Sequence, residues 1–150
     1  MNLIEEDHPQ VKPMAIFGEI TREDMQKNAL LAKVVMKRVK EVCEHSKGRY
    51  SVQQVADGFA AGVCSIWGVM EPPADLVAIM VTAPNEGVLD VLLAGPDIKD
   101  VTPFLPRLDG IARANKCAKV RMMGPGFWKT HLDGWKPAVT VYERDLAATH

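Results

Sequence analysis

The side chains best suited to metal chemistry in this chain are four histidines and three cysteines. Cys43, Cys64 and Cys117 have no C-x-x-C spacing, and a metal site drawn through Cys117 and His131 matches no paired-ligand motif. Each cysteine lies inside an apolar periodic segment, so we interpret all three as reduced thiols of a core. The sequence therefore predicts no metal site and no disulfide framework.

Other catalytic motifs are also weak. No serine, histidine and acid combination has the context of a nucleophile elbow, and Gly124–Gly126 is too short for a phosphate-cradling loop. Lys116, Lys119, Arg121 and Lys129 form a basic stripe with few interleaved aromatics, which is typical of a solvated sheet edge. These patterns give little support to a hydrolase, an NTPase or a nucleic-acid-binding protein.

Composition describes an ordinary globular domain of 150 residues, 47% of them apolar and 25% charged. The formal net charge is −1, so no global field attracts nucleic acid or an anionic membrane. The sequence has no apolar run near the ~20 residues of a membrane span, and residues 1–7 are acidic where a signal peptide is basic. We expect a protein that stays in the cytoplasm where it is made.

Aromatic residues give the best candidates for a protein interface. Phe127 and Trp128 lie in a glycine-flanked stretch, where exposed rings suit a protein partner and buried rings suit a core, and both interpretations stay open. Phe17 in the N-terminal segment is a third interface candidate. Trp67 and Trp135 are better explained as core residues.

The elements that position these residues begin after residues 1–20, which contain Pro9 and Pro13 and which we interpret as an arm. Residues 14–17 of this arm could form an anchoring strand or turn. Thr21 with Asp24 predicts the start of a long amphipathic helix that runs to residues 47–48. A second capping signal predicts a shorter helix that ends near residue 62; its two residues are Ser51 and Gln54. Residues 21–150 are expected to form one domain.

From residue 63 the pattern changes to β-rich runs at 64–70, 76–82 and 88–94, whose short connections predict an antiparallel meander. A helix is predicted from Thr102–Pro103 to residues 115–116, and a strand at 117–123 that is parallel and adjacent to strand 88–94. A short helix at 127–132 and a final strand at 135–146 follow. The fold class is α+β, in the order ααβββαβαβ.

This order resembles that of the GNAT (GCN5-related N-acetyltransferase) fold over residues 21–146. The strand at 117–121, followed by a short helix and the turn at 133–135, resembles the family's fifth strand, fourth helix and glycine-aromatic turn. The chain is more specifically similar to small GNAT-like proteins encoded among the structural genes of tailed phages. That similarity rests on the segments 124–128 and 141–146.

An active member of the family holds the pyrophosphate of acetyl-CoA on the N–H groups of a glycine-rich turn that leads into its third helix. Here residues 93–103 contain one glycine, two prolines, and the carboxylates of Asp97 and Asp100. We therefore expect no cofactor. If acetyl-CoA does bind, the resemblance assigns it to three residues: Gly95, Lys99 and Val101.

The family's frequent general acid, a tyrosine on the fourth helix, corresponds to Thr130, whose alcohol is too weak an acid. His131 is adjacent and could replace it, although the interpretation of this histidine as a half-exposed helix residue is favoured. Glu71 or Asp75 could act as a general base, but both are well explained as turn carboxylates. No catalytic residue is favoured.

Two functions remain open. The first, which we favour from the sequence, is a non-catalytic GNAT-fold interaction module that is part of a phage virion or tail. Its partners would be phage structural proteins or further copies of the chain. The alternative is a divergent acetyl-CoA-dependent N-acetyltransferase. Fold alone does not separate them, because function depends on the site.

Overall fold

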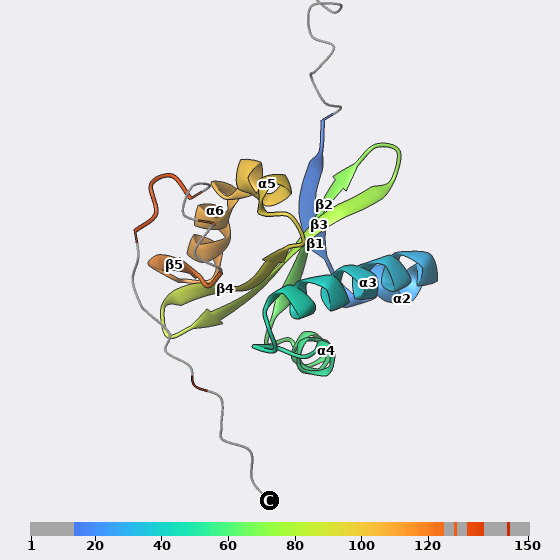
Figure 1. Ribbon diagram of the computed structural model, residues 1–150, viewed down its shortest axis with the longest axis horizontal. Coiled ribbons are helices and arrows are strands. Elements are labelled where there is room, and N and C mark those ends of the chain that lie inside the picture. Colours follow the sequence, from blue (N-terminus) through green and yellow to red (C-terminus); the bar gives the residue numbers. More distant parts are fainter. Residues whose placement is uncertain (1–13, 125–127, 129–131, 137–143, 145–150) are drawn as a thin grey trace, which may run out of the picture.

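The computed structural model describes residues 14–124, 128, 132–136 and 144. Its centre is a five-stranded sheet in the order β1-β2-β3-β4-β5 (Figure 1). The strands are β1 (Ile16–Ile20), β2 (Ser65–Glu71), β3 (Asp75–Asn85), β4 (Val88–Gly95) and β5 (Lys119–Met122). Strands β1 to β4 pair antiparallel, and β5 pairs parallel to β4. The predicted antiparallel meander with an adjacent parallel strand is confirmed.

Helices cover both faces of the sheet. One face carries α2 (Arg22–Lys27), α3 (Ala29–His45) and α4 (Val52–Ala60). The other carries α5 (Ile98–Val101), the 3-10 turn η1 (Thr102–Phe104) and α6 (Arg107–Ala114). Figure 1 shows α3 and α4 on the opposite side of the sheet from α5 and α6. This arrangement confirms the α+β class, and it buries the central strands on both faces.

The N-terminal helices begin where the capping signals place them. The Thr21 hydroxyl accepts from the Asp24 N–H, and the Asp24 carboxylate accepts from the Thr21 N–H. The predicted single helix is nevertheless two helices, because the backbone of Asn28 is extended and its side chain accepts from the N–H of Leu31 to start α3. Asparagine competes for backbone groups in this way and often ends or starts a helix.

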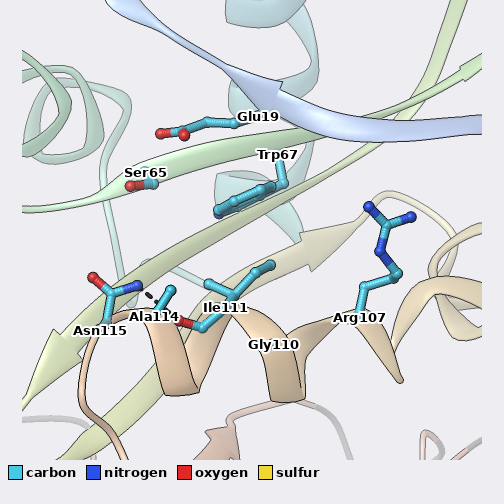
Figure 2. A pocket seen from close by; sticks show the side chains of 8 residues that line it. All are labelled: Glu19, Ser65, Trp67, Arg107, Gly110, Ile111, Ala114 and Asn115. Atoms are coloured by element: carbon cyan, nitrogen blue, oxygen red, sulfur yellow. Dashed lines mark hydrogen bonds between the residues drawn. The ribbon is translucent and has the colours of Figure 1, made fainter.

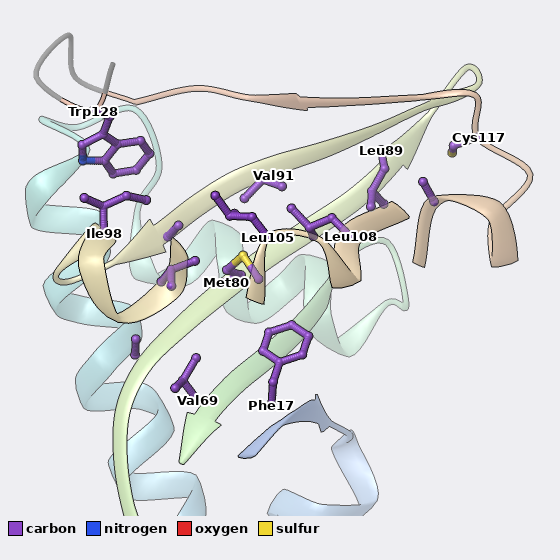
Figure 3. Packing of buried hydrophobic residues seen from close by; sticks show 14 residues of the cluster. Phe17, Val69, Met80, Leu89, Val91, Ile98, Leu105, Leu108, Cys117 and Trp128 are labelled. Carbon is purple, nitrogen blue, oxygen red and sulfur yellow. The ribbon is translucent and has the colours of Figure 1, made fainter. Parts of the chain in front are cut away.

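Two apolar cores lie on the two faces of the sheet. Under α3 and α4, the residues Val35, Val39 and Val42 pack against alternate side chains of the strands. Under α5 and α6, the core includes Met80, Leu89, Val91, Leu105 and Leu108 (Figure 3). The three cysteines are free and buried, as the sequence predicts. Burial raises the pKa of the Cys43 and Cys64 thiols.

The N-terminal arm is shorter than expected. Residues 16–20 form β1, which pairs with β2 from Ile16↔Met70 to Ile20↔Ile66. Phe17 is buried and stacks on Trp67 and Phe104, with ring centroids 5.7 and 5.4 Å apart. Its ring therefore stabilises the core and offers no surface to a partner, which corrects the interface hypothesis for Phe17. Residues 1–13 lie outside the described residues, so the arm stays a prediction there.

Candidate functional site

The most distinctive site in the described residues is the point where β4 and β5 stop pairing. Their parallel register runs from Val88↔Lys119 to Val91↔Met122. Beyond it, residues 93–95 of β4 pair with β3 alone among the described residues. Within the described part of the chain, the backbone N–H and C=O groups that β4 directs to that edge therefore lack strand partners. We call the next register position, Leu92 with Met123, the fork.

A β-bulge lies at the fork. Val81 of β3 faces Leu93 and Thr82 faces Val91, so Leu92 is an extra residue in β4. A bulge leaves one residue out of the ladder, bends the strand and increases its twist. The bend in β4 at Leu92 coincides with the end of its pairing to β5, which explains why these strands separate here.

Arg49 joins the two strands at the fork. It follows α3, and its Nη2 donates to the carbonyl oxygens of Leu92, at 3.0 Å, and Met123, at 3.4 Å. A side chain therefore takes the place of the next backbone pairing of the ladder. The guanidinium carbon lies 5.8 Å from the centroid of the Tyr50 ring, which covers it in a cation–π contact.

The charge of Arg49 has no carboxylate partner among the described residues. The ion pairs of that part of the chain join Lys27 to Glu23, Arg38 to Glu41 and Arg121 to Asp90. The Nε of Arg49 is fully buried and has no hydrogen-bond partner within the described residues. A buried donor without an acceptor costs about 1–3 kcal/mol. Among the described residues, this cation therefore has neither a carboxylate that neutralises it nor an acceptor for its Nε–H.

A second ion pair holds the strands together before the fork. Arg121 donates from Nε and Nη2 to the two carboxylate oxygens of Asp90, at 2.8 and 3.3 Å. The two residues face each other in the register, and the hydrogen bond and charge of Asp90 raise the pKa of Arg121. This contact fixes the paired part of β4 and β5, so the separation starts at one defined place.

The turn after β4 holds the three cofactor candidates of the sequence. Gly95 is buried with φ +137°, a conformation that favours glycine. The side chain of Lys99 is exposed, whereas that of Val101 is fully buried in the core and cannot touch a ligand. Asp97 caps α5, because its carboxylate accepts from the N–H of Lys99 at 2.9 Å. One N–H that an anion would use is therefore already occupied.

The catalytic candidates are not brought together at the fork. Glu71 ends β2 and faces Asp75 across the hairpin. It lies three residues, or about 10 Å along the strand, beyond Gly68, which is level with Ile79 and Gly95. The hairpin position supports its interpretation as a turn carboxylate. Thr130 and His131 lie outside the described residues, as does the interface candidate Phe127.

Trp128 is buried, and its ring belongs to the core that contains Ala94 and Ile98 (Figure 3). The ring also covers Gly124, where an added Cβ would lie 2.0 Å from its Cε3. Trp128 therefore packs beside the start of α5. This burial corrects the hypothesis that its ring is an exposed interface residue.

A separate cavity of about 450 Å³ lies over β1 and β2, on the α6 side. Figure 2 shows Glu19 and Ser65 on its strand side, Arg107 on α6, Asn115 directly after α6, and the Trp67 ring between the two sides. In the sheet order, β1 and β2 are at the opposite side from β5. The cavity is thus distinct from the fork. Trp67, which the sequence predicts to be a core residue, is one of the residues that line it.

The last features concern metal binding and membrane spans in the described part of the chain. It holds no group of three or more His, Cys, Asp or Glu side chains placed to bind a metal ion. Within that same part, no helix has the length and apolar character needed to cross a membrane.

Sequence reasoning missed Arg49. No motif marks it, because its role depends on two carbonyl groups that are 43 and 74 residues away in the sequence. It also missed α5, which starts at Ile98 rather than at Thr102–Pro103. The cap at Asp97 was a signal for that start, because aspartate is a preferred N-cap residue.

No protein-family model and no curated protein matches the chain. Among solved structures, a probable acetyltransferase matches with TM-score 0.57 and 12% identity, over 90% of this chain and 99% of its own. A GNAT family acetyltransferase of Staphylococcus aureus matches with TM-score 0.56 and 7% identity, over 88% and 98%.

An aminoglycoside acetyltransferase from an uncultured soil metagenomic sample, crystallised with sisomicin, matches with TM-score 0.59 and 8% identity, over 89% and 97% of the two chains. These neighbours correct the expectation that the chain takes no cofactor, because an acetyltransferase needs an acetyl donor. They give no support to a phage structural protein. At such identities the likeness shows the fold, and the chain has the fold of the GNAT acetyltransferases.

Proposed function

We propose that this chain is an acetyl-CoA-dependent N-acetyltransferase whose acetyl donor lies along β4 beyond the fork. The observation that carries this proposal is the separation of two parallel strands at Leu92 and Met123, produced by a bulge and joined by Arg49. An extended arm with its own amides, such as pantetheine, can pair with the open edge at residues 93–95 as an added strand does.

The donor's phosphates fit the turn after β4 only in part. Lys99 supplies an exposed cation there, but Asp97 adds a negative charge and takes the Lys99 N–H. Like charges near an anion site weaken binding, and the short helix α5 offers little compensation. We therefore expect a donor affinity in the weaker half of the usual range for enzyme substrates, which spans roughly 1 µM to 1 mM.

Acetyl transfer requires that a neutral amine attack the thioester carbonyl carbon and that the sulfur leave with the bonding electron pair. A backbone N–H that residues 93–95 direct toward this edge, and not toward β3, is suited to polarise a carbonyl oxygen that lies there. The amine acceptor is left open, and the sisomicin in the metagenomic enzyme is a property of that protein.

Calorimetric titration with acetyl-CoA tests the proposal. We expect saturable binding by the wild type, weakened several-fold in Lys99→Glu, because this change removes the cation at the turn. The matched control is Lys119→Glu, which alters an exposed lysine at the other end of the β4–β5 pairing and should bind as the wild type does. A wild-type protein that shows no binding at 1 mM acetyl-CoA would contradict the proposal.

Acetyl transfer itself is measured as release of free thiol in the presence of amine panels that include polyamines, amino acids and aminoglycosides. Donor-dependent release that requires an amine is the expected result. Donor binding with hydrolysis alone would assign the fork to a thioesterase and would contradict an N-acetyltransferase.

A further inference from the structure

We infer that Arg49 is a catalytic residue that stabilises the thiolate leaving the acetyl donor, an inference that rests on the proposed function. Its guanidinium lies at the fork, bonded to both strands where they part. The chain has Thr130 where the resemblance places an acidic tyrosine. A fixed positive charge near the sulfur makes a proton donor at that position unnecessary.

The position of Arg49 follows from the geometry of the two strands. Backbone pairing closes β4 and β5 up to Val91 and Met122, so an arm lying along residues 93–95 cannot pass the fork. The phosphate end of the donor is too bulky and too polar for the narrow part and belongs at the turn near Gly95. The slim thioester end therefore points to the fork, where Arg49 donates to the Leu92 and Met123 carbonyls.

The positive charge of Arg49 at the fork is available to stabilise a thiolate. In the described residues it has no carboxylate partner, and its buried Nε–H has no acceptor. On β4 and β5, Asp90 and Arg121 neutralise each other. A guanidinium in a partly buried site acts on a nearby charge more strongly than one in water does.

The other charged groups near this region lie on the elements that flank Arg49. At the end of α3, the side chains of Glu44, His45 and Lys47 are exposed, and Tyr50 covers the guanidinium itself. On the β4–α5 turn, Asp97 bonds a backbone N–H. None of these groups forms an ion pair with Arg49 among the described residues, so none cancels its charge by direct contact.

Acetyl transfer from the thioester to the amine needs no acid from the protein. The amine nitrogen forms a bond to the carbonyl carbon, the carbon–sulfur bond breaks, and its electron pair stays on sulfur. The proton lost by the amine passes to water. Arg49 transfers no proton in this step and contributes electrostatic stabilisation alone.

The ionisation of the CoA thiol bound to the protein tests this role without measuring activity. An opposite charge within about 4–6 Å lowers a pKa by about 1–3 units. We expect the thiol of CoA bound to the wild type to titrate about 1–3 units below free CoA, followed by thiolate absorbance against protein without CoA. The buried cysteines of the chain are common to both samples and cancel.

Two variants separate charge from structure. Arg49→Gln keeps a donor for the Leu92 and Met123 carbonyls but removes the charge, so the bound thiol should titrate as in free CoA. Arg49→Lys keeps the charge, so most of the downward shift should remain. Calorimetry supplies the CoA affinity of each variant, and thermal unfolding shows whether the fork has been damaged.

The outcomes distinguish this inference from the proposed function. No CoA binding by the wild type overturns the proposed function. Binding with a thiol that titrates as in free CoA overturns the role of Arg49 and leaves the proposed function standing. An equal shift in the wild type and Arg49→Gln also overturns it, and so does an Arg49→Gln protein that is folded but no longer binds CoA, because Arg49 would then be a binding residue.

Discussion

At the scale of single residues, the open edge of β4 has charges of opposite sign at its two ends, Arg49 at the fork and Asp97 at the turn. We expect Asp97→Asn to raise the affinity for acetyl-CoA roughly fivefold, because it removes a negative charge near the phosphates and keeps an oxygen that can cap α5. Calorimetry at low and high salt measures the change, which should shrink as salt screens the charge.

Asp109→Asn is the matched control for Asp97→Asn. Asp109 is exposed in the first turn of α6 and is not part of the turn after β4. The change in formal charge is identical, so a purely global effect of charge would appear in both variants. Equal affinities for Asp97→Asn and the wild type would show that the phosphates do not approach this turn.

Two glycines differ in what covers them. At Gly124 an added Cβ would lie 2.0 Å from the Trp128 ring, whereas at Gly110 it would meet nothing within 4 Å. Gly124→Ala should therefore destabilise the protein by about 1–3 kcal/mol, because a rigid ring has to move. Gly110→Ala should stabilise it by about 0.5–1 kcal/mol, because Gly110 is inside α6.

Urea unfolding of both glycine variants gives these free energies. The pair is matched, because each variant adds one methyl group at a position outside the left-handed region. If Gly124→Ala unfolded at the same urea concentration as the wild type, the ring of Trp128 would not lie over Gly124.

At the scale of elements, α2 and α4 begin with the same motif and differ in one titratable group. Hydrogen bonds from the backbone and side chain of Thr21 lower the pKa of Asp24 below the usual value of an aspartate. A carboxylate with a lowered folded pKa contributes stability above its unfolded pKa, and that contribution is lost as the pH falls through the folded value. The stability difference between the wild type and Asp24→Ala should therefore be constant from pH 7 to 5 and should decrease below about pH 4.

The motif at α4 is the internal control, because Gln54 takes the place of the aspartate and does not titrate. Gln54→Ala should cost about 1 kcal/mol at every pH. Urea unfolding at a series of pH values measures both differences. A cost for Asp24→Ala that persisted unchanged at pH 2.5 would show that the ionised carboxylate is not what stabilises α2.

At the scale of the whole molecule, the thiols report on the two cores separately. Cys43 and Cys64 belong to the core under α3 and α4, and Cys117 to the core under α5 and α6. Burial raises the pKa of Cys43 and Cys64, so the less reactive thiol form is favoured there. All three should react with a thiol reagent at pH 7.5 at least roughly a hundredfold more slowly than in urea.

Mass spectrometry of peptides after timed labelling assigns the rates to each cysteine. Similar rates at all three positions would indicate that the two cores open together, as in cooperative unfolding. A Cys117 that reacted in the native protein as fast as in urea would contradict its burial against α6.

The local elements were largely predictable from the sequence. The capping residues Thr21 and Ser51 and the alternation of the β-rich runs rely on contacts a few residues apart, which a sequence pattern records directly. The break at Asn28 also had a local signal, but the apolar residues continue at helical spacing across it and predict one helix. The N-cap of α5 at Asp97 had a local signal too, but the Thr102–Pro103 pair is a second possible helix start nearby.

By itself, the sequence determined the meander, the parallel strand and the positions of α3, α4 and α6 to within a few residues, because burial of periodic apolar residues fixes element type and face. Tertiary structure decided that Phe17 belongs to the core and that β1 closes the edge of the sheet, because one short apolar run does not show which surface covers it. It also decided the fork. The unpaired edge of β4, the bulge at Leu92 and the approach of Arg49 arise from pairings between distant segments, and no local pattern encodes such a pairing.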